Sequence, residues 1–308
     1  MDLGEFHDVK PVIISAVIIM NITLNSIVIA VIAKYPQLRE DRTTLFMFSL
    51  TISDFAAGCT CMPISVVLCS ELTPHTRNML RHLPKVQAVG MTWFAFISLH
   101  SLGWMTLFKM AAILKPFRCE QLLTRHRCYV IIAAVWITGA LVAVVGTAFT
   151  MGWDLQKCTC IMPLNSEMAI LYTIVVLVLC VALPVIAIIY ATARILTATI
   201  RVNNQISQQV HSIGGVKVAT GNVVCLTLQS IRSGKNILLM CLGEVALTTP
   251  LSAGISLRIV GLENQLPPWY GFVAFWIAMC HATFNCVLYL VLFRTVRMKA
   301  KQMFKQCC

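Results

Sequence analysis

The chain has 308 residues, of which 58% are apolar and only 12% charged, whereas soluble globular domains carry about 25% charged residues. Together with a mean hydropathy of +0.81, this composition excludes an ordinary soluble domain. The formal net charge is +12, but Lys and Arg collect in alternate loops between apolar stretches, so we expect anionic membrane lipid and no nucleic acid as the partner of this charge.

Seven stretches of the sequence contain almost no charge over the length of a membrane span. A bilayer core requires about 20 apolar residues in a helix, because lipid offers no partner to unpaired N–H and C=O groups. We therefore predict an all-α membrane protein: a seven-transmembrane helix bundle with a short amphipathic cytoplasmic eighth helix, forming one domain over residues 1–308. The predicted spans are 11–34, 44–69, 86–114, 128–152, 167–198, 234–260 and 267–293, and the amphipathic helix covers 294–306.

The basic residues predict the orientation of these spans. Most of the 24 Lys and Arg residues lie after the first, third, fifth and seventh stretches. Because cytoplasmic loops carry the excess of positive charge, we expect a multi-pass plasma-membrane protein with an extracellular N-terminus and a cytoplasmic C-terminus.

Two acids lie inside the predicted spans, Asp54 in the second and Glu244 in the sixth. A carboxylate in hydrocarbon costs several kcal/mol unless it is paired or hydrated, so intramembrane acids are functional candidates.

Three cysteines lie on or near the predicted outer side, where a disulfide persists. Cys158 and Cys160 both have the location to bridge to Cys69, and the sequence alone does not fix the connectivity.

The segment after the fifth span, residues 202–235, is polar at first and contains Gly214 and Gly215. Val223 to Leu228 is apolar again, which favours an inward extension of the sixth helix.

Beyond the seventh span, apolar residues recur at helical spacing beside basic ones, which is typical of a helix lying along the inner membrane surface. The terminal Cys307 and Cys308 would then reach the interface, where we expect S-acylation.

Almost every span carries one recognisable motif residue, in a consistent order along the chain. These are Asn25, Asp54 in a Leu-x-x-x-Asp pattern, Trp136, Pro184 with Tyr190, Pro250, and Asn285-Cys286-Val287-Leu288-Tyr289. In this respect the chain resembles a rhodopsin-like (class A) G-protein-coupled receptor. The resemblance implies signalling to heterotrimeric G proteins.

The resemblance also implies roles for particular residues. Asp54, Ser98 and Asn285 resemble the family's sodium pocket, so an allosteric Na⁺ is the one cofactor we consider. Glu244 and His281 stand near the same level, which raises the alternative of a proton-linked cluster; a third alternative is simple interhelical hydrogen bonding. The activation switch would comprise Asn25, Lys109, Tyr190, Glu244, Thr248, Pro250, His281 and Tyr289.

By the same resemblance, a ligand would contact the outer half of the bundle. No acid occurs near Met91 to bind an amine, and no lysine in the seventh span to bind retinal, so we expect an apolar or lipid-like small molecule. The lining residues are Met91, Thr92, Ala95, Ser252, Phe275 and Met279.

The departures from the family pattern concern residues that hold the inactive state. The Asp-Arg-Tyr triplet is Phe108-Lys109-Met110, so Lys109 keeps a cation but loses the bidentate guanidinium, and Phe108 cannot restrain it. Thr248 and Glu244 replace the family's aromatic residues. Two readings follow: raised basal activity, or a poorly signalling decoy or partner subunit.

Other functional classes have less support. Asp54, Glu244 and His281 would also suit a proton-linked transporter, but no paired broken helices occur. There is no metal spacing, nucleophile motif or phosphate loop, so we expect no enzymatic activity. Residues 294–308 contain Thr295 and no Ser/Thr cluster, so we expect weak arrestin recruitment.

Overall fold

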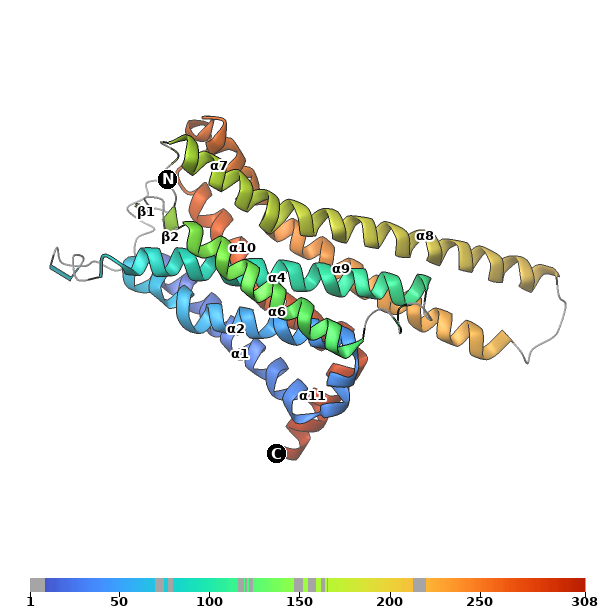
Figure 1. The fold of residues 1–308 in the computed structure, drawn as a ribbon. Helices are drawn as coiled ribbons and strands as arrows, with labels where there is room; N and C mark the ends of the chain where they lie inside the picture. The colour runs from blue at the N-terminus through green and yellow to red at the C-terminus, as the bar shows by residue number, and fades with distance from the viewer. Residues whose placement is uncertain are drawn as a thin grey trace.

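The computed structural model describes residues 9–69, 75–76, 80–115, 119, 121, 124–146, 152–154, 159–161, 164, 166–212 and 220–307. They form a bundle of long α-helices (Figure 1), which confirms the predicted fold class. Within the described residues, seven helices are long and apolar enough to cross a membrane. The first four are α1 (Val9–Lys34), α2 (Arg42–Cys69), α4 (Leu83–Leu114) and α6 (Arg125–Val145).

The fifth span is continuous from Glu167 to Ala198 and joins three segments. They are α7 (Glu167–Val176), a π-helical turn η4 (Leu177–Ala182) and α8 (Leu183–Ser212). The sixth and seventh spans belong to α9 (Thr220–Ile259) and α10 (Tyr270–Leu292), followed by α11 (Arg294–Cys307). Two short 3₁₀ turns, η2 (Pro36–Glu40) and η5 (Glu263–Gln265), lie in connections.

Local chemistry sets where several helices begin. The Asp41 Oδ1 accepts a hydrogen bond of 3.1 Å from the Thr43 N–H at the start of α2. The Ser166 Oγ accepts one of 3.2 Å from the Ala169 N–H at the start of α7. These side chains satisfy amides that have no partner inside the helix.

The π-helical turn lies immediately before Pro184. The Leu183 N–H donates to the Val178 carbonyl, five residues earlier, and Pro184 has no N–H to donate. A π turn next to a proline is one of the ways in which a helix accommodates a lost backbone hydrogen bond.

The fourth helix is shorter than predicted, because it ends at Val145 rather than at residue 152. Residues 152–154 form a strand instead: β1 (Gly152–Asp154) pairs antiparallel with β2 (Thr159–Ile161). The backbone N–H and C=O groups of residues 152–154 are therefore hydrogen-bonded to β2 and not within a helix.

At the end of α6, the Tyr172 hydroxyl donates to the Val142 carbonyl at 2.9 Å. A Cβ on Gly146 would lie 2.5 Å from that hydroxyl.

The bundle has two ends, which we call the hairpin end and the α11 end. At the α11 end, α11 packs across α1 and α10, and Lys34 Nζ donates to the Gln306 side chain at 2.9 Å. Figure 1 shows α8 and α9 extending together beyond the end of α4. The start of α9 at Thr220 confirms the predicted extension of the sixth helix over Val223–Leu228.

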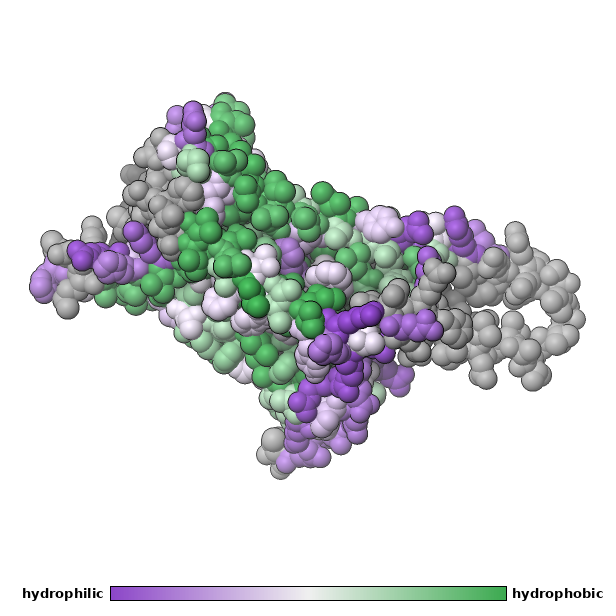
Figure 2. Space-filling view, in the orientation of Figure 1, coloured by the Kyte–Doolittle hydropathy of each residue, from purple (hydrophilic) through white to green (hydrophobic). Residues whose placement is uncertain are grey.

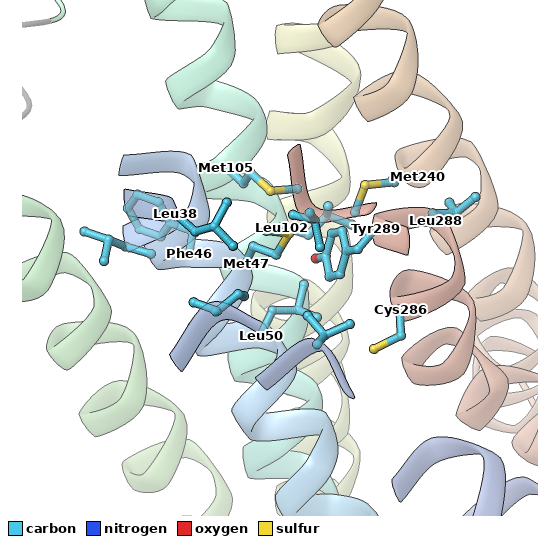
Figure 3. Packing of buried hydrophobic residues seen from close by; sticks show 14 of the residues in the cluster. Leu38, Phe46, Met47, Leu50, Leu102, Met105, Met240, Cys286, Leu288 and Tyr289 are labelled. Carbon is cyan, nitrogen blue, oxygen red and sulfur yellow. The ribbon is translucent and has the colours of Figure 1, made fainter. Parts of the chain in front are cut away.

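The described part of the interior contains three hydrophobic clusters, and two of them are larger than the third, which surrounds Phe96 and Ile97. Of these two, the larger lies toward the α11 end and surrounds the fully buried ring of Tyr289 (Figure 3), with Leu102 and Met240 among its members. The smaller lies toward the hairpin end around Phe275 and Trp276. Hydrophobic residues also cover the outside of the middle of the bundle, whereas hydrophilic residues gather on α11 (Figure 2), as a protein surrounded by lipid requires.

Candidate functional site: a buried carboxylate and histidine cluster

Four helices each bring one polar side chain to the middle of the bundle. Asp54 comes from α2, Ser98 from α4, Glu244 from α9 and His281 from α10. Asp54 is 3% exposed, Glu244 1% and His281 7%. Two acids and an imidazole thus share the interior of the bundle, where unpaired charge is costly.

His281 is fixed by contacts on both ring nitrogens. Its Nδ1 lies 2.5 Å from the Ala278 carbonyl oxygen, and its Nε2 lies 3.4 Å from Ser98 Oγ. The same Nε2 is 3.8 Å from Asp54 Oδ1. Since a carbonyl oxygen can only accept, Nδ1 carries a hydrogen, and Nε2 is the nitrogen that faces Asp54 and Ser98.

Glu244 approaches the cluster from α9. The Asn285 Nδ2 donates to Glu244 Oε2 over 3.4 Å. Three oxygens of this group have no hydrogen-bond partner among the described residues: Asp54 Oδ2, Glu244 Oε1 and Asn285 Oδ1. Buried polar atoms are rarely left without a partner, so this arrangement has capacity for further hydrogen bonds.

A second polar layer on α1 supports Asp54. The Asn21 Nδ2 donates to the Asp54 backbone carbonyl at 2.9 Å, and the Asn25 Nδ2 donates to the Asn21 carbonyl, also at 2.9 Å. The Cys286 thiol of α10 donates to Asn25 Oδ1 at 2.9 Å. The predicted switch residue Asn25 therefore connects α1 to α10.

Sequence reasoning missed two residues of this layer, Asn21 and Gly58. Asn21 lies one helical turn before Asn25, a spacing that places both on one face of α1 and was the available signal. Gly58 is needed because a Cβ there would lie 2.7 Å from Asn21 Nδ2.

The resemblance implies a sodium ion held by Asp54, Ser98 and Asn285, and the geometry tests that set of ligands. The His281 Nε2 already approaches both Asp54 and Ser98, while the Asn285 amide nitrogen is turned toward Glu244. A hard cation needs several oxygen ligands, and Asp54 Oδ2 and Asn285 Oδ1 have no partner among the described residues. The sodium site and the proton-linked alternative therefore both stay predictions.

Toward the hairpin end, α9 carries the next two switch residues. The Thr248 hydroxyl donates to the Glu244 carbonyl at 2.8 Å, so it is satisfied within its own helix. Pro250 interrupts the backbone hydrogen bonds of α9, and its carbonyl accepts a hydrogen bond of 2.6 Å from the Tyr270 hydroxyl of α10. The helix that carries Glu244 is thus tied to α10 beside its proline.

Toward the α11 end, the predicted switch residue Tyr289 is packed in apolar surroundings. Tyr289 is fully buried, and its hydroxyl has no partner among the described side chains. Phe108 is also buried in the larger hydrophobic cluster. Thr106 on α4 and Cys241 on α9 contact each other at 3.5 Å, which joins these helices near the same level.

Tyr190 is a predicted switch residue that lies away from the buried cluster. Its side chain is 53% exposed on α8, so it faces the lipid side. The family's tyrosine lies two residues later, and two residues turn a helix by about 200°. That rotation places Tyr190 on the outer face.

Three of the predicted ligand-contacting residues belong to the smaller cluster or pack against it. Phe275 and Met279 are buried in it, and Met91 packs against it. Thr92 and Ala95 are half-buried on α4. The Ser252 hydroxyl donates to the Thr248 carbonyl at 3.1 Å, so its hydrogen is used within α9.

Cys69 is disulfide-bonded. Cys158 and the side chain of Cys160 lie outside the described residues, so the choice of partner stays a prediction. Cys308 and the side chain of Cys307 also lie outside them, so acylation stays a prediction as well.

The family model of the 7 transmembrane receptor (rhodopsin family) matches residues 24–299. The crystal structure of squid rhodopsin is similar with a TM-score of 0.82 at 16% sequence identity, covering 100% of this chain and 87% of that one. No curated protein matches the chain.

Proposed function

Because this chain belongs to the rhodopsin family of seven-transmembrane receptors, we propose that it transmits a signal across the plasma membrane to heterotrimeric G proteins. The distribution of Lys and Arg supports a cytoplasmic α11 end and an extracellular hairpin end. In this proposal, the buried cluster is the point where movements of α2, α4, α9 and α10 are coupled.

We further propose that the receptor has raised basal activity, and the surroundings of Phe108 and Lys109 are the observation that carries this proposal. Phe108 is buried among apolar side chains, so no acid at this position restrains its neighbour. Lys109 is half-buried near the end of α4, and it makes no ion pair with any residue that the structure describes.

The magnitude follows from two-state energetics. An inactive-state restraint worth about 1–3 kcal/mol changes the balance of two conformations by about five- to over a hundred-fold. A receptor without that restraint therefore populates its active state to a greater extent in the absence of ligand. The alternative, a decoy or partner subunit, follows if Lys109 cannot replace an arginine toward the G protein.

Basal G-protein dissociation in cells expressing the chain tests the proposal. We expect output above that of untransfected cells, and we expect Lys109→Ala to reduce it at equal surface expression. Lys115→Ala is the matched control, because Lys115 is an exposed lysine just beyond the same helix and its loss should leave output unchanged. No basal output from any Gα class would favour the decoy.

We propose an apolar or lipid-like ligand for the extracellular half of the bundle. Phe275, Met279 and Met91 supply a mainly apolar environment there, and the described residues around them include no carboxylate to hold an amine. Competition of a hydrophobic fluorescent probe by candidate lipids, compared between the unmodified chain and Met279→Asp, tests the ligand class. Equal probe binding by both proteins would argue against this location.

A further inference from the structure

We infer that Asn236 is a positioning residue: its side chain holds the α11-end half of α9 against the end of α10, and this contact limits the receptor's basal activity. The Asn236 Nδ2 donates to the Leu292 carbonyl at 2.9 Å. The effect on activity rests on the proposed function, whereas the effect on the position of α9 does not.

The acceptor of this hydrogen bond is a carbonyl at the end of a helix. Leu292 is the last residue of α10, and the last four carbonyls of a helix have no partner within it. A basic side chain of the following segment often satisfies such a group, as Arg297 Nη1 does by donating to the Val291 carbonyl at 2.5 Å. At Leu292 the donor comes from another membrane span. The bond therefore caps α10 and joins it to α9.

The end of α10 is a fixed point to which α9 can be tied. The chain turns at Phe293, where ψ is 96°, and α11 packs across α1 and α10. Val296 and Ala300 of α11 are buried in the larger hydrophobic cluster together with residues of α1. Near the end of α11, Lys34 Nζ donates to the Gln306 side chain. The corner between α10 and α11 is thus held from α1, independently of α9.

The same half of α9 packs mainly against α10. Met240, one turn from Asn236, is buried in the larger cluster (Figure 3). Gly243 lies so close to Phe284 of α10 that an added Cβ would overlap the ring. Among the side chains that the structure describes, Asn236 is the one nearest to Thr220 that bonds another helix. It is therefore the described contact most sensitive to a tilt of α9.

A tilt of α9 at Pro250 breaks this hydrogen bond. Asn236 lies 14 residues from Pro250, which is about 21 Å along the helix at 1.5 Å per residue. A tilt of about 10° away from α10 moves Asn236 by about 4 Å, which is beyond the reach of an N–H···O bond. The bond between the Tyr270 hydroxyl and the Pro250 carbonyl lies at the pivot and is retained. The Asn236 bond thus exists in only one of the two positions of α9.

A bond that exists in one conformation shifts the equilibrium toward it. The net contribution of a typical hydrogen bond changes a two-state balance about five-fold. Phe108 is buried among apolar side chains and supplies no acid, so the restraint described for other receptors at this level is missing here. The amide of Asn236 restrains α9 without any charged partner, because its acceptor is a backbone carbonyl.

Distance measurements by electron spin resonance on the purified full chain in nanodiscs test the position of α9 without a G protein. Nitroxide labels are attached through p-acetylphenylalanine, which leaves the native cysteines unmodified, at Arg232 on α9 and at the exposed Met298 on α11. Asn236→Leu should raise the ratio of the longer to the shorter distance about five-fold. Asn236→Ala, with the same expected change, replaces it if the leucine variant does not fold.

Two further variants separate positioning from general stability. Asn236→Gln keeps an amide donor and should restore most of the shorter distance. Gln306→Leu removes another amide hydrogen bond of 2.9 Å at the same end, between Lys34 and Gln306, and should leave the distances unchanged because α9 takes no part in it. In cells, Asn236→Leu should raise basal G-protein dissociation at equal surface expression, and Asn236→Gln should return it toward the level of the unmodified chain.

Three outcomes decide the inference. If Asn236→Leu lowers the unfolding midpoint and leaves the distances unchanged, the bond only stabilises the fold and the inference is wrong. An equal change of distances in Gln306→Leu would also overturn it, because any weakening of this end would then release α9. A change confined to the Asn236 variants, with no G-protein output from any of them, would support the positioning of α9 and count against the proposed signalling function.

Discussion

Replacing Gly58 with alanine tests the packing of α1 against α2 beside the buried cluster. In an ordinary helix this change stabilises by about 1 kcal/mol, because alanine is the better helix former. Here the new Cβ would lie 2.7 Å from Asn21 Nδ2 and 3.1 Å from Ile22 Cγ1. The Asn21 amide would have to move, although it donates to the Asp54 carbonyl at 2.9 Å.

Two opposing contributions determine the size of the effect. Overpacking costs about 1–3 kcal/mol and a lost hydrogen bond about 1 kcal/mol, against the gain of about 1 kcal/mol in helix propensity. We therefore expect Gly58→Ala to destabilise by about 1–3 kcal/mol, which lowers the unfolding midpoint by several degrees.

A double-mutant cycle with Asn21→Ala, measured by thermal unfolding, isolates the contact. The cost of Gly58→Ala should largely disappear once the Asn21 side chain is removed. Gly103→Ala is the control, because its Cβ would come no closer than 3.7 Å to Pro184, and it should be neutral or stabilising. An unchanged cost of Gly58→Ala without the asparagine would refute this account.

Three hydrogen bonds between or within helices give further predictions, each checked by the unfolding midpoint. Trp136→Phe removes the indole N–H that donates to Ser49 Oγ at 3.0 Å, and we expect the free energy of unfolding to fall by about 1 kcal/mol. The fall should be smaller when Ser49 has already been replaced by alanine. Tyr270→Phe removes the hydroxyl that donates to the Pro250 carbonyl, with a similar loss; an unaltered midpoint would mean that this bond contributes nothing. Ser166→Ala removes the cap of α7 and should lower the free energy of unfolding by about 1 kcal/mol. Ser166→Asp should retain most of the stabilisation by the cap, because aspartate also accepts a hydrogen bond there.

The sequence was sufficient to predict the spans, because lipid imposes a minimum length of apolar helix whatever the tertiary contacts are. It was also sufficient to single out Asp54 and Glu244, since an acid in an apolar stretch is rare. The extent of α6 was predicted wrongly because residues 146–152 contain no charge and no proline that would end the apolar stretch, and pairing with β2 lies beyond local pattern.

The cluster itself was only partly predictable. The level of His281 near Asp54 followed from the family resemblance, but the side of the ring that faces the carboxylate depends on the Ala278 carbonyl, which composition does not reveal. The roles of Asn21 and Gly58 required knowledge of how closely two helices approach. Tyr190 shows the same limit, since a shift of two residues reverses the face that a side chain occupies.

Because α9 is long, a small tilt of this helix within the membrane displaces its far end by a large distance. From Pro250 to Thr220 the helix extends about 45 Å at 1.5 Å per residue. A tilt of about 10° at the proline, well within what a proline kink allows, displaces the far tip by about 8 Å. Because Pro250 lies six residues beyond Glu244, a small adjustment of α9 near that carboxyl group would move the Thr220 end of the helix by several ångströms.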